Sequence, residues 1–176
     1  MYRVLGALAL LSFAASAQKQ PLTVNQMMKL ARISDPQLSP DAQTVLFTVQ
    51  TVDLEKNSKP RQIYSIPVAG GSPHAITSQG NNERPRWMPD GKRVVFISSR
   101  GGSTQVWRVP TTGGEAQKVT SLPVDVEGML PFADGKRLAL ILDVYPDAAT
   151  LDETHARDEA RSKNPSKVRA FTALPV

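Results

Sequence analysis

The sequence predicts an all-β protein: an incomplete β-propeller of about two and a half four-stranded blades, preceded by a signal peptide and a short helix. Two repeated elements predict this fold. Residues 36–47 and 85–96 share the pattern P-x-x-x-P-D-x-x-x-V-x-F, and residues 62–71 and 105–114 share Q-x-x-x-x-P-x-x-G-G. Elements that recur in one order every ~45 residues are typical of propeller blades. A β-sandwich also has frequent turns, but its strands need not repeat as an ordered motif.

Composition excludes several other classes. Of the 176 residues, 40% are hydrophobic and 21% are charged, which is typical neither of a coiled coil nor of a disordered tail. The sequence has no cysteine, so disulfide scaffolds, cysteine-ligated metal sites and cysteine nucleophiles are excluded. The formal net charge is +5, but basic and acidic residues are interspersed, so we expect no nucleic-acid partner.

The first seventeen residues are typical of a secretory signal peptide. Arg3 precedes an uncharged apolar stretch over residues 4–15, and Ala15-Ser16-Ala17 provides small residues for cleavage after Ala17. Twelve helical residues would cover only about 18 Å of a ~30 Å hydrocarbon core, which argues against a membrane anchor. We therefore expect export to the periplasm or the medium, with no membrane contact after cleavage.

Residues 18–32 are expected to form an N-terminal helical segment. Thr23 is a candidate N-cap, and Gln26 stands three residues later, as in a capping box. The pattern predicts a helix over residues 24–32, with Met27, Leu30 and Ala31 on one face.

Two complete blades follow, over residues 33–78 and 79–121. In each, a Pro-Asp turn is followed by a short apolar run, and residues 94–97 are typical of a strand buried on both faces. We expect a hydrophilic turn at residues 99–103, an alternating strand at 106–109, a Gly-Gly turn and a final short strand that ends at Thr120.

Residues 122–176 are predicted to form a partial third blade with a charged insertion, truncated after residue 176. Residues 124–145 would supply its first two strands, because the turn motif recurs a third time at Asp134-Gly135. Residues 147–167 are polar and predict a solvated helix or a long loop. The spacing from Glu153 to Arg157 favours a helix, whereas that from Arg157 to Arg161 opposes it.

We expect no catalytic, cofactor-binding or metal-binding residue in this chain. Ser72 and Ser103 each follow a Gly two residues earlier but lack the second Gly of the G-x-S-x-G nucleophile elbow. His74 and His155 are expected to be exposed polar residues, since no oriented Ser–His–Asp arrangement can be argued for either.

Other recurring residues have structural interpretations. Asp41, Asp90 and Asp134 lie inside turn motifs, so we expect them to cap turns rather than to bind calcium. The Gly-Gly pairs 70–71, 101–102 and 113–114 are not followed by the lysine and helix of a phosphate loop. We predict that three aromatic residues occupy equivalent strand positions in their blades and pack between blades: Tyr64, Trp87 and Trp107.

The tandem P-D-G units, each followed by an aromatic residue and a Gly-Gly pair, resemble the TolB-like repeats of bacterial propellers. The order along the chain extends this resemblance. An export signal, a short helix and then the segment 33–41 are similar to the N-terminal end of secreted prolyl oligopeptidase-family serine peptidases, including the dipeptidyl and acylaminoacyl branches. The stretch from Tyr145 to Phe171 is similar to the extended third blade of those enzymes.

The resemblance implies that the propeller restricts access of peptide substrates to an α/β-hydrolase domain, which carries G-x-S-x-G, Asp and His and is absent from this chain. At ~45 residues per blade, a ring of seven or eight blades needs ~315–360 residues. Two alternatives are a non-enzymatic binding or scaffold propeller like that of the Tol envelope system, and short chains that assemble into a ring. The sequence leaves the oligomeric state open.

Overall fold

In the computed structural model, residues 21–163 are described. The predicted signal peptide, residues 1–17, and the end of the predicted third blade, residues 164–176, lie outside the described residues. Within the described range, neither helix is long and apolar enough to cross a membrane.

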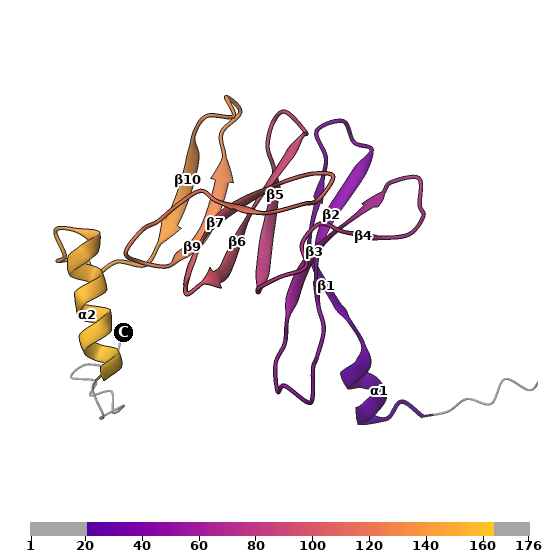
Figure 1. The fold of residues 1–176 in the computed structure, drawn as a ribbon, viewed down its shortest axis with the longest axis horizontal. Coiled ribbons are helices and arrows are strands. Elements are labelled where there is room, and N and C mark those ends of the chain that lie inside the picture. The colour runs from indigo at the N-terminus through magenta and orange to yellow at the C-terminus, as the bar shows by residue number, and fades with distance from the viewer. Residues whose placement is uncertain (1–20, 164–176) are drawn as a thin grey trace, which may run out of the picture.

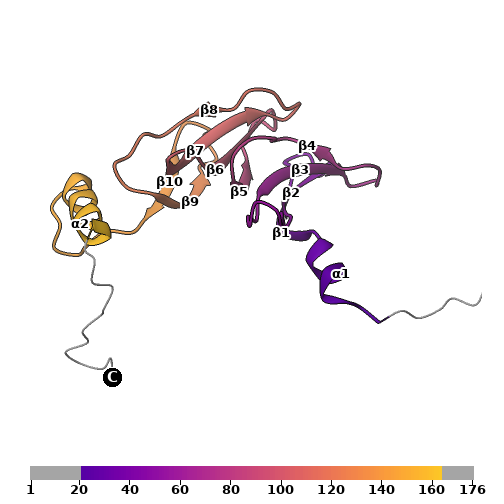
Figure 2. The ribbon, with the colours of Figure 1, turned by 60° about the horizontal axis from the view of Figure 1, so that its bottom comes forward.

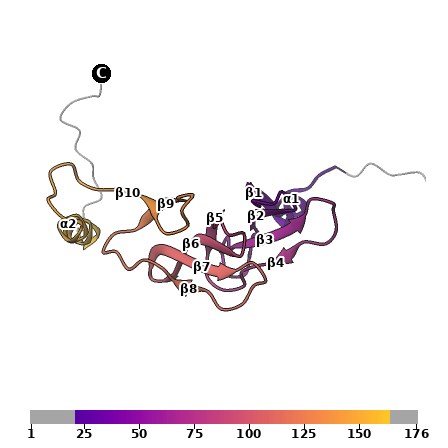
Figure 3. The same cartoon turned by 90° about the horizontal axis from the view of Figure 1, so that it is seen from above.

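The described chain folds into three antiparallel sheets, two of four strands and one of two, each with its strands in sequence order. The first sheet contains β1 (Arg32–Leu38), β2 (Thr44–Gln50), β3 (Arg61–Pro67) and β4 (His74–Ala75). The second contains β5 (Asn82–Trp87), β6 (Arg93–Gly101), β7 (Ser103–Pro110) and β8 (Gln117–Lys118). The third contains β9 (Val126–Pro131) and β10 (Leu138–Leu142). The sheets follow one another along an arc, with β1, β5 and β9 on its inner side and β4 and β8 on its outer side (Figure 3). The predicted fold class, a partial β-propeller, is confirmed.

The N-terminal helix α1 (Val24–Lys29) is shorter than predicted. Its capping box is present, because the Thr23 hydroxyl accepts from the Gln26 backbone N–H and the Gln26 side chain accepts from the Thr23 backbone N–H. The prediction that the helix continues to Arg32 is wrong. Leu30 is already extended, and Arg32 pairs with Gln50 as the first residue of β1, so sheet pairing ends the helix.

The second helix, α2 (Leu151–Lys163), lies in the predicted charged insertion. Figures 1 and 2 show α1 and α2 at opposite ends of the arc. The first turn of α2 carries Asp152 and Glu153, and its last turn carries Arg161 and Lys163. These charges are opposite in sign to the helix dipole at each end and so stabilise the helix. Arg157 forms ion pairs with Glu153 and Asp147, and these two carboxylates offset the repulsion between Arg157 and Arg161.

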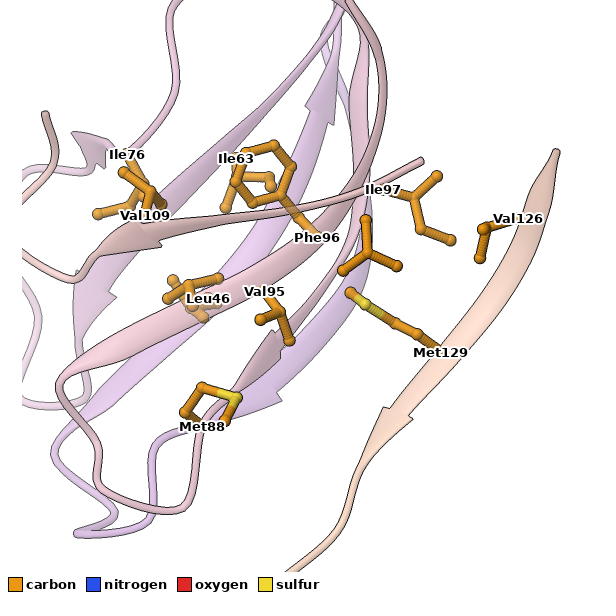
Figure 4. Close-up of a cluster of buried hydrophobic side chains, with 12 residues drawn as sticks. Leu46, Ile63, Ile76, Met88, Val95, Phe96, Ile97, Val109, Val126 and Met129 are labelled. Atoms are coloured by element: carbon orange, nitrogen blue, oxygen red, sulfur yellow. The ribbon is translucent and has the colours of Figure 1, made fainter. Parts of the chain in front are cut away.

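The hydrophobic core lies between successive sheets. The side chains of Leu46 and Ile63 from the first sheet meet Phe96 from the second, and Val126 and Met129 from β9 cover the opposite side of the second sheet (Figure 4). Residues 94–98 of β6 are all buried, because a sheet lies on each face. The predicted doubly buried strand is therefore confirmed.

A glutamine connects the first sheet to the second, and another connects the second sheet to the third. Gln105 is fully buried; its amide accepts from the Thr120 hydroxyl and the Leu122 backbone N–H, and donates to the carbonyl oxygens of Leu122 and Val124. Gln62 makes the equivalent contacts with the Thr77 hydroxyl and the Gly80 carbonyl oxygen. We call this set of hydrogen bonds made by the Gln105 or Gln62 side chain the clasp. It fixes the chain where it leaves one sheet and enters the next.

The turn predicted at residues 99–103 is shorter in the structure. Strand β6 continues to Gly101, and β7 begins at Ser103. Gly102 has a φ of 98°, and its N–H donates to the Ser99 carbonyl oxygen, so a tight turn joins the two strands. The left-handed conformation at Gly102 needs a residue without a Cβ atom.

Candidate functional site

The residues considered for nucleophilic catalysis do not form a catalytic arrangement. Ser72 and His74 are both exposed and line a groove of about 550 Å³, in which Asp41 and Asp90 also lie. Ser103 lies at the start of β7, and His155 lies exposed on α2. Among the described residues, no hydrogen bond joins either of these serines to a histidine.

The three recurrent aspartates accept backbone hydrogen bonds within their turns. Asp90 accepts from the Lys92 N–H at 3.0 Å, and Asp134 accepts from the Lys136 N–H at 2.9 Å. These hydrogen bonds, followed by those from the Arg93 and Arg137 side chains, lower the pKa of the two carboxyl groups. The pKa of Asp41 is lowered first by the Ser39 hydroxyl and then by the Gln43 N–H. No group of three or more metal-ligating side chains occurs among residues 21–163.

We expect these turns to make stability depend on acidic pH. A carboxyl group with a lowered folded pKa stabilises the protein fully above the unfolded value of about 3.9, and this stability is lost as the pH falls through the folded pKa. The triple variant Asp41→Asn, Asp90→Asn, Asp134→Asn should therefore lose less stability than the unchanged protein between about pH 5 and pH 2. Urea unfolding across this range measures the difference.

The matched control for the turn variants is Asp143→Asn, which removes an exposed carboxylate with no ion pair or hydrogen bond among the described residues. An acid-induced loss of stability that is equally steep in the triple variant and the unchanged protein would contradict the prediction.

The aromatic side chains do not share one position, so the predicted equivalence of Tyr64, Trp87 and Trp107 is wrong. Trp87 ends β5, a first strand, whereas Tyr64 and Trp107 lie in the third strands β3 and β7. Trp87 Nε1 donates to the Gln37 carbonyl oxygen at 3.1 Å and so joins the second sheet to the first. Tyr64 stacks on Phe47 within its own sheet.

A polar cleft of about 420 Å³ lies between the first and second sheets. Two ion pairs connect the sheets across it: Arg86 Nη1 lies 2.7 Å from Asp35 Oδ2, and Arg61 Nη1 lies 3.1 Å from Glu83 Oε2. The cleft is also lined by Arg84, which forms no ion pair within residues 21–163. Three arginines and two acidic residues therefore line the cleft, so its lining carries a net positive charge.

One of the residues that line this polar cleft is unusual. Thr48 of β2 is 2% exposed, and its hydroxyl has no hydrogen-bond partner in the described part of the chain. The repeat offsets place Ile97 and Ile141 at the same position in the second and third sheets. Our sequence interpretation did not identify the cleft, but a polar residue where sister repeats carry isoleucine is a signal that could have indicated it.

Comparison with known proteins supports the propeller fold and identifies the family to which the chain is similar. The model of the TolB β-propeller domain matches residues 13–148. Dipeptidyl-peptidase 5 of Porphyromonas gingivalis is 30% identical over 161 residues, which are 91% of this chain and 24% of that protein. The Tol-Pal system protein TolB of Bordetella pertussis is 39% identical over only 57 residues, 31% of this chain and 13% of that protein.

Solved structures agree on the fold. An acylaminoacyl peptidase of Pyrococcus horikoshii superposes on 70% of this chain and 19% of its own with a TM-score of 0.56, at 24% identity. The chain thus spans about a quarter of the curated peptidase and a fifth of the solved one.

Proposed function

The chain belongs to the TolB β-propeller domain family, and from this premise we propose that it forms the propeller part of an exported serine peptidase of the prolyl oligopeptidase family. The observation that carries the proposal is the likeness to dipeptidyl-peptidase 5, which extends over 91% of the chain. Family relatives that are peptidases match the propeller and the segments on either side of it, whereas the likeness to TolB covers 31% of the chain.

In this proposal the chain is non-catalytic and limits which peptides reach a hydrolase domain. A closed propeller has typically 4–8 blades around a central channel, and β1, β5 and β9 lie on the side of the arc that would face such a channel. The lack of a second glycine after Ser72 and after Ser103 supports placing the nucleophile in the hydrolase domain. The apolar stretch before Ala17 supports export.

We expect the chain alone to hydrolyse no peptide anilide. The reading frame that continues from Val176 should encode G-x-S-x-G followed by Asp and His, and its product should hydrolyse dipeptidyl anilides and react with a serine-directed phosphonate. The matched control is the same long protein with the serine of G-x-S-x-G changed to alanine. Turnover by the 176-residue chain would contradict the assignment.

The likeness to TolB favours one other function, a periplasmic binding or scaffold propeller without catalysis. The same reading frame distinguishes the two functions. Further repeats and then a stop codon would support the binding propeller, and a G-x-S-x-G sequence would support the peptidase.

A further inference from the structure

We propose that the polar cleft between the first and second sheets binds a carboxylate group presented by a peptide. The charge of the lining is the first argument: three arginines, Arg61, Arg84 and Arg86, line the cleft against two acidic residues, each of which is already paired with an arginine. An anion that enters the cleft would neutralise the excess positive charge. The choice of a peptide as the carrier rests on the proposed function, whereas the choice of a carboxylate rests on the cleft.

The arginines have donors left to bind an anion. Arg86 uses Nη1 for both Asp35 and the Pro85 carbonyl oxygen, and Arg61 pairs with Glu83 through Nη1. Their other guanidinium nitrogens have no partner in the part of the chain that the structure describes. The planar fork of a guanidinium fits the two oxygens of a carboxylate, and these two forks come from different sheets.

Thr48 is an independent observation that points to a ligand. A buried hydroxyl without a partner destabilises a protein, and valine would fill the same space without that cost. The sister sheets carry the apolar residues Ile97 and Ile141 at this position. The Thr48 hydroxyl therefore has no partner among the described residues of the free chain, and in our proposal a small rearrangement of the cleft on binding lets it donate to the carboxylate.

Backbone conformation at the edge of the cleft supports the same assignment. Asp35 and Arg84 occupy equivalent positions in β1 and β5, at irregularities of strand pairing, and have φ values of 51° and 53°. The third sheet has Gly128 at the equivalent position of the repeat. A Cβ atom on Gly128 would lie 2.9 Å from Ile141 Cδ1 and 3.4 Å from Arg84 Nη1, so the glycine leaves room for both side chains where β5 meets the third sheet. Strain kept at charged residues is typical of functional sites.

The test measures binding to the full chain immobilised at low density, with two N-acetylated penta-alanine peptides. One ends in a free carboxylate and the other in an amide. We expect the free acid to bind at least about tenfold more tightly than the amide, and this difference to shrink as salt is raised. Equal binding of the two peptides would overturn the proposal.

Variants separate binding from folding. Thr48→Val should weaken binding of the free acid about fivefold while the urea midpoint stays equal or rises, because the lost hydroxyl has no partner to leave behind. Arg84→Gln should weaken binding of the free acid about threefold, because the substitution removes one positive charge from the cleft. The matched control is Arg108→Gln, an exposed arginine on β7 whose side chain hydrogen-bonds only Gln117 among residues 21–163. Full affinity in Thr48→Val would overturn the proposed site.

Competition identifies the kind of anion. Acetate should displace the free-acid peptide at lower concentration than inorganic phosphate does. The reverse order would overturn the carboxylate assignment in favour of a phosphate group. Because no step of this experiment involves hydrolysis, its outcome is separate from that of the peptidase assay.

Discussion

Phe96→Ala should lower the free energy of unfolding by about 3–5 kcal/mol, the largest loss that we expect from a single substitution in this chain. Phe96 is completely buried in β6 and packs in the cluster that joins the first and second sheets (Figure 4). The guanidinium of Arg100 also lies over its ring, with Cζ 5.4 Å from the centroid. Truncation would therefore leave a cavity between two sheets and remove a cation–π contact.

Urea unfolding at low protein concentration, followed by tryptophan fluorescence, measures this loss, because Trp107 pairs with Phe96 in the strand register. The matched control is Phe132→Ala. Phe132 is 43% exposed and also carries an arginine over its ring, so we expect a change below about 1 kcal/mol. A loss below about 1 kcal/mol for Phe96→Ala would contradict the inter-sheet core.

Gln105→Leu should lower the free energy of unfolding by about 3 kcal/mol, although leucine has a similar volume and is more apolar. The substitution leaves the Leu122 N–H and the carbonyl oxygens of Leu122 and Val124 without the partner they have in the structure. A buried backbone group without a hydrogen bond costs about 1–3 kcal/mol, so the loss of the clasp outweighs the gain in apolar burial.

The matched control for Gln105→Leu is Gln117→Leu, at an exposed position of β8 where the side-chain amide hydrogen-bonds only Arg108 within the described part of the chain. We expect a change within about 0.5 kcal/mol there. Urea unfolding of the two variants in parallel tests the prediction, and an equal midpoint shift in both would show that the clasp contributes nothing.

Local and periodic features could be predicted from the sequence. The repeated Pro-Asp turns and Gln-aromatic strands predicted four-stranded units, because turn chemistry and two-residue alternation act over a few neighbouring residues. The Thr23 capping box was predicted for the same reason. The end of α1 could not be predicted, because it depends on pairing of Arg32 with Gln50, eighteen positions further along the chain.

The candidate site was largely beyond reach of the sequence. Arg61 and Glu83, like Arg86 and Asp35, come from different repeats, and no local pattern indicates that they meet. The aromatic residues show the same limit: Trp87 is similar to Tyr64 in type, but its place in the first strand gives it a backbone acceptor in the neighbouring sheet.

The sequence by itself determined that this protein is a repeat of small β-sheets, since each repeat encodes its own turns and buried strands. Only the tertiary structure decided what the repeats form together. Stacking of one sheet on the next places Thr48 in the same cleft as two inter-sheet ion pairs, and it buries Gln105. The physical reason is that turns and alternation are set by near neighbours, whereas charge pairing and burial between sheets depend on residues that approach only after the sheets have packed.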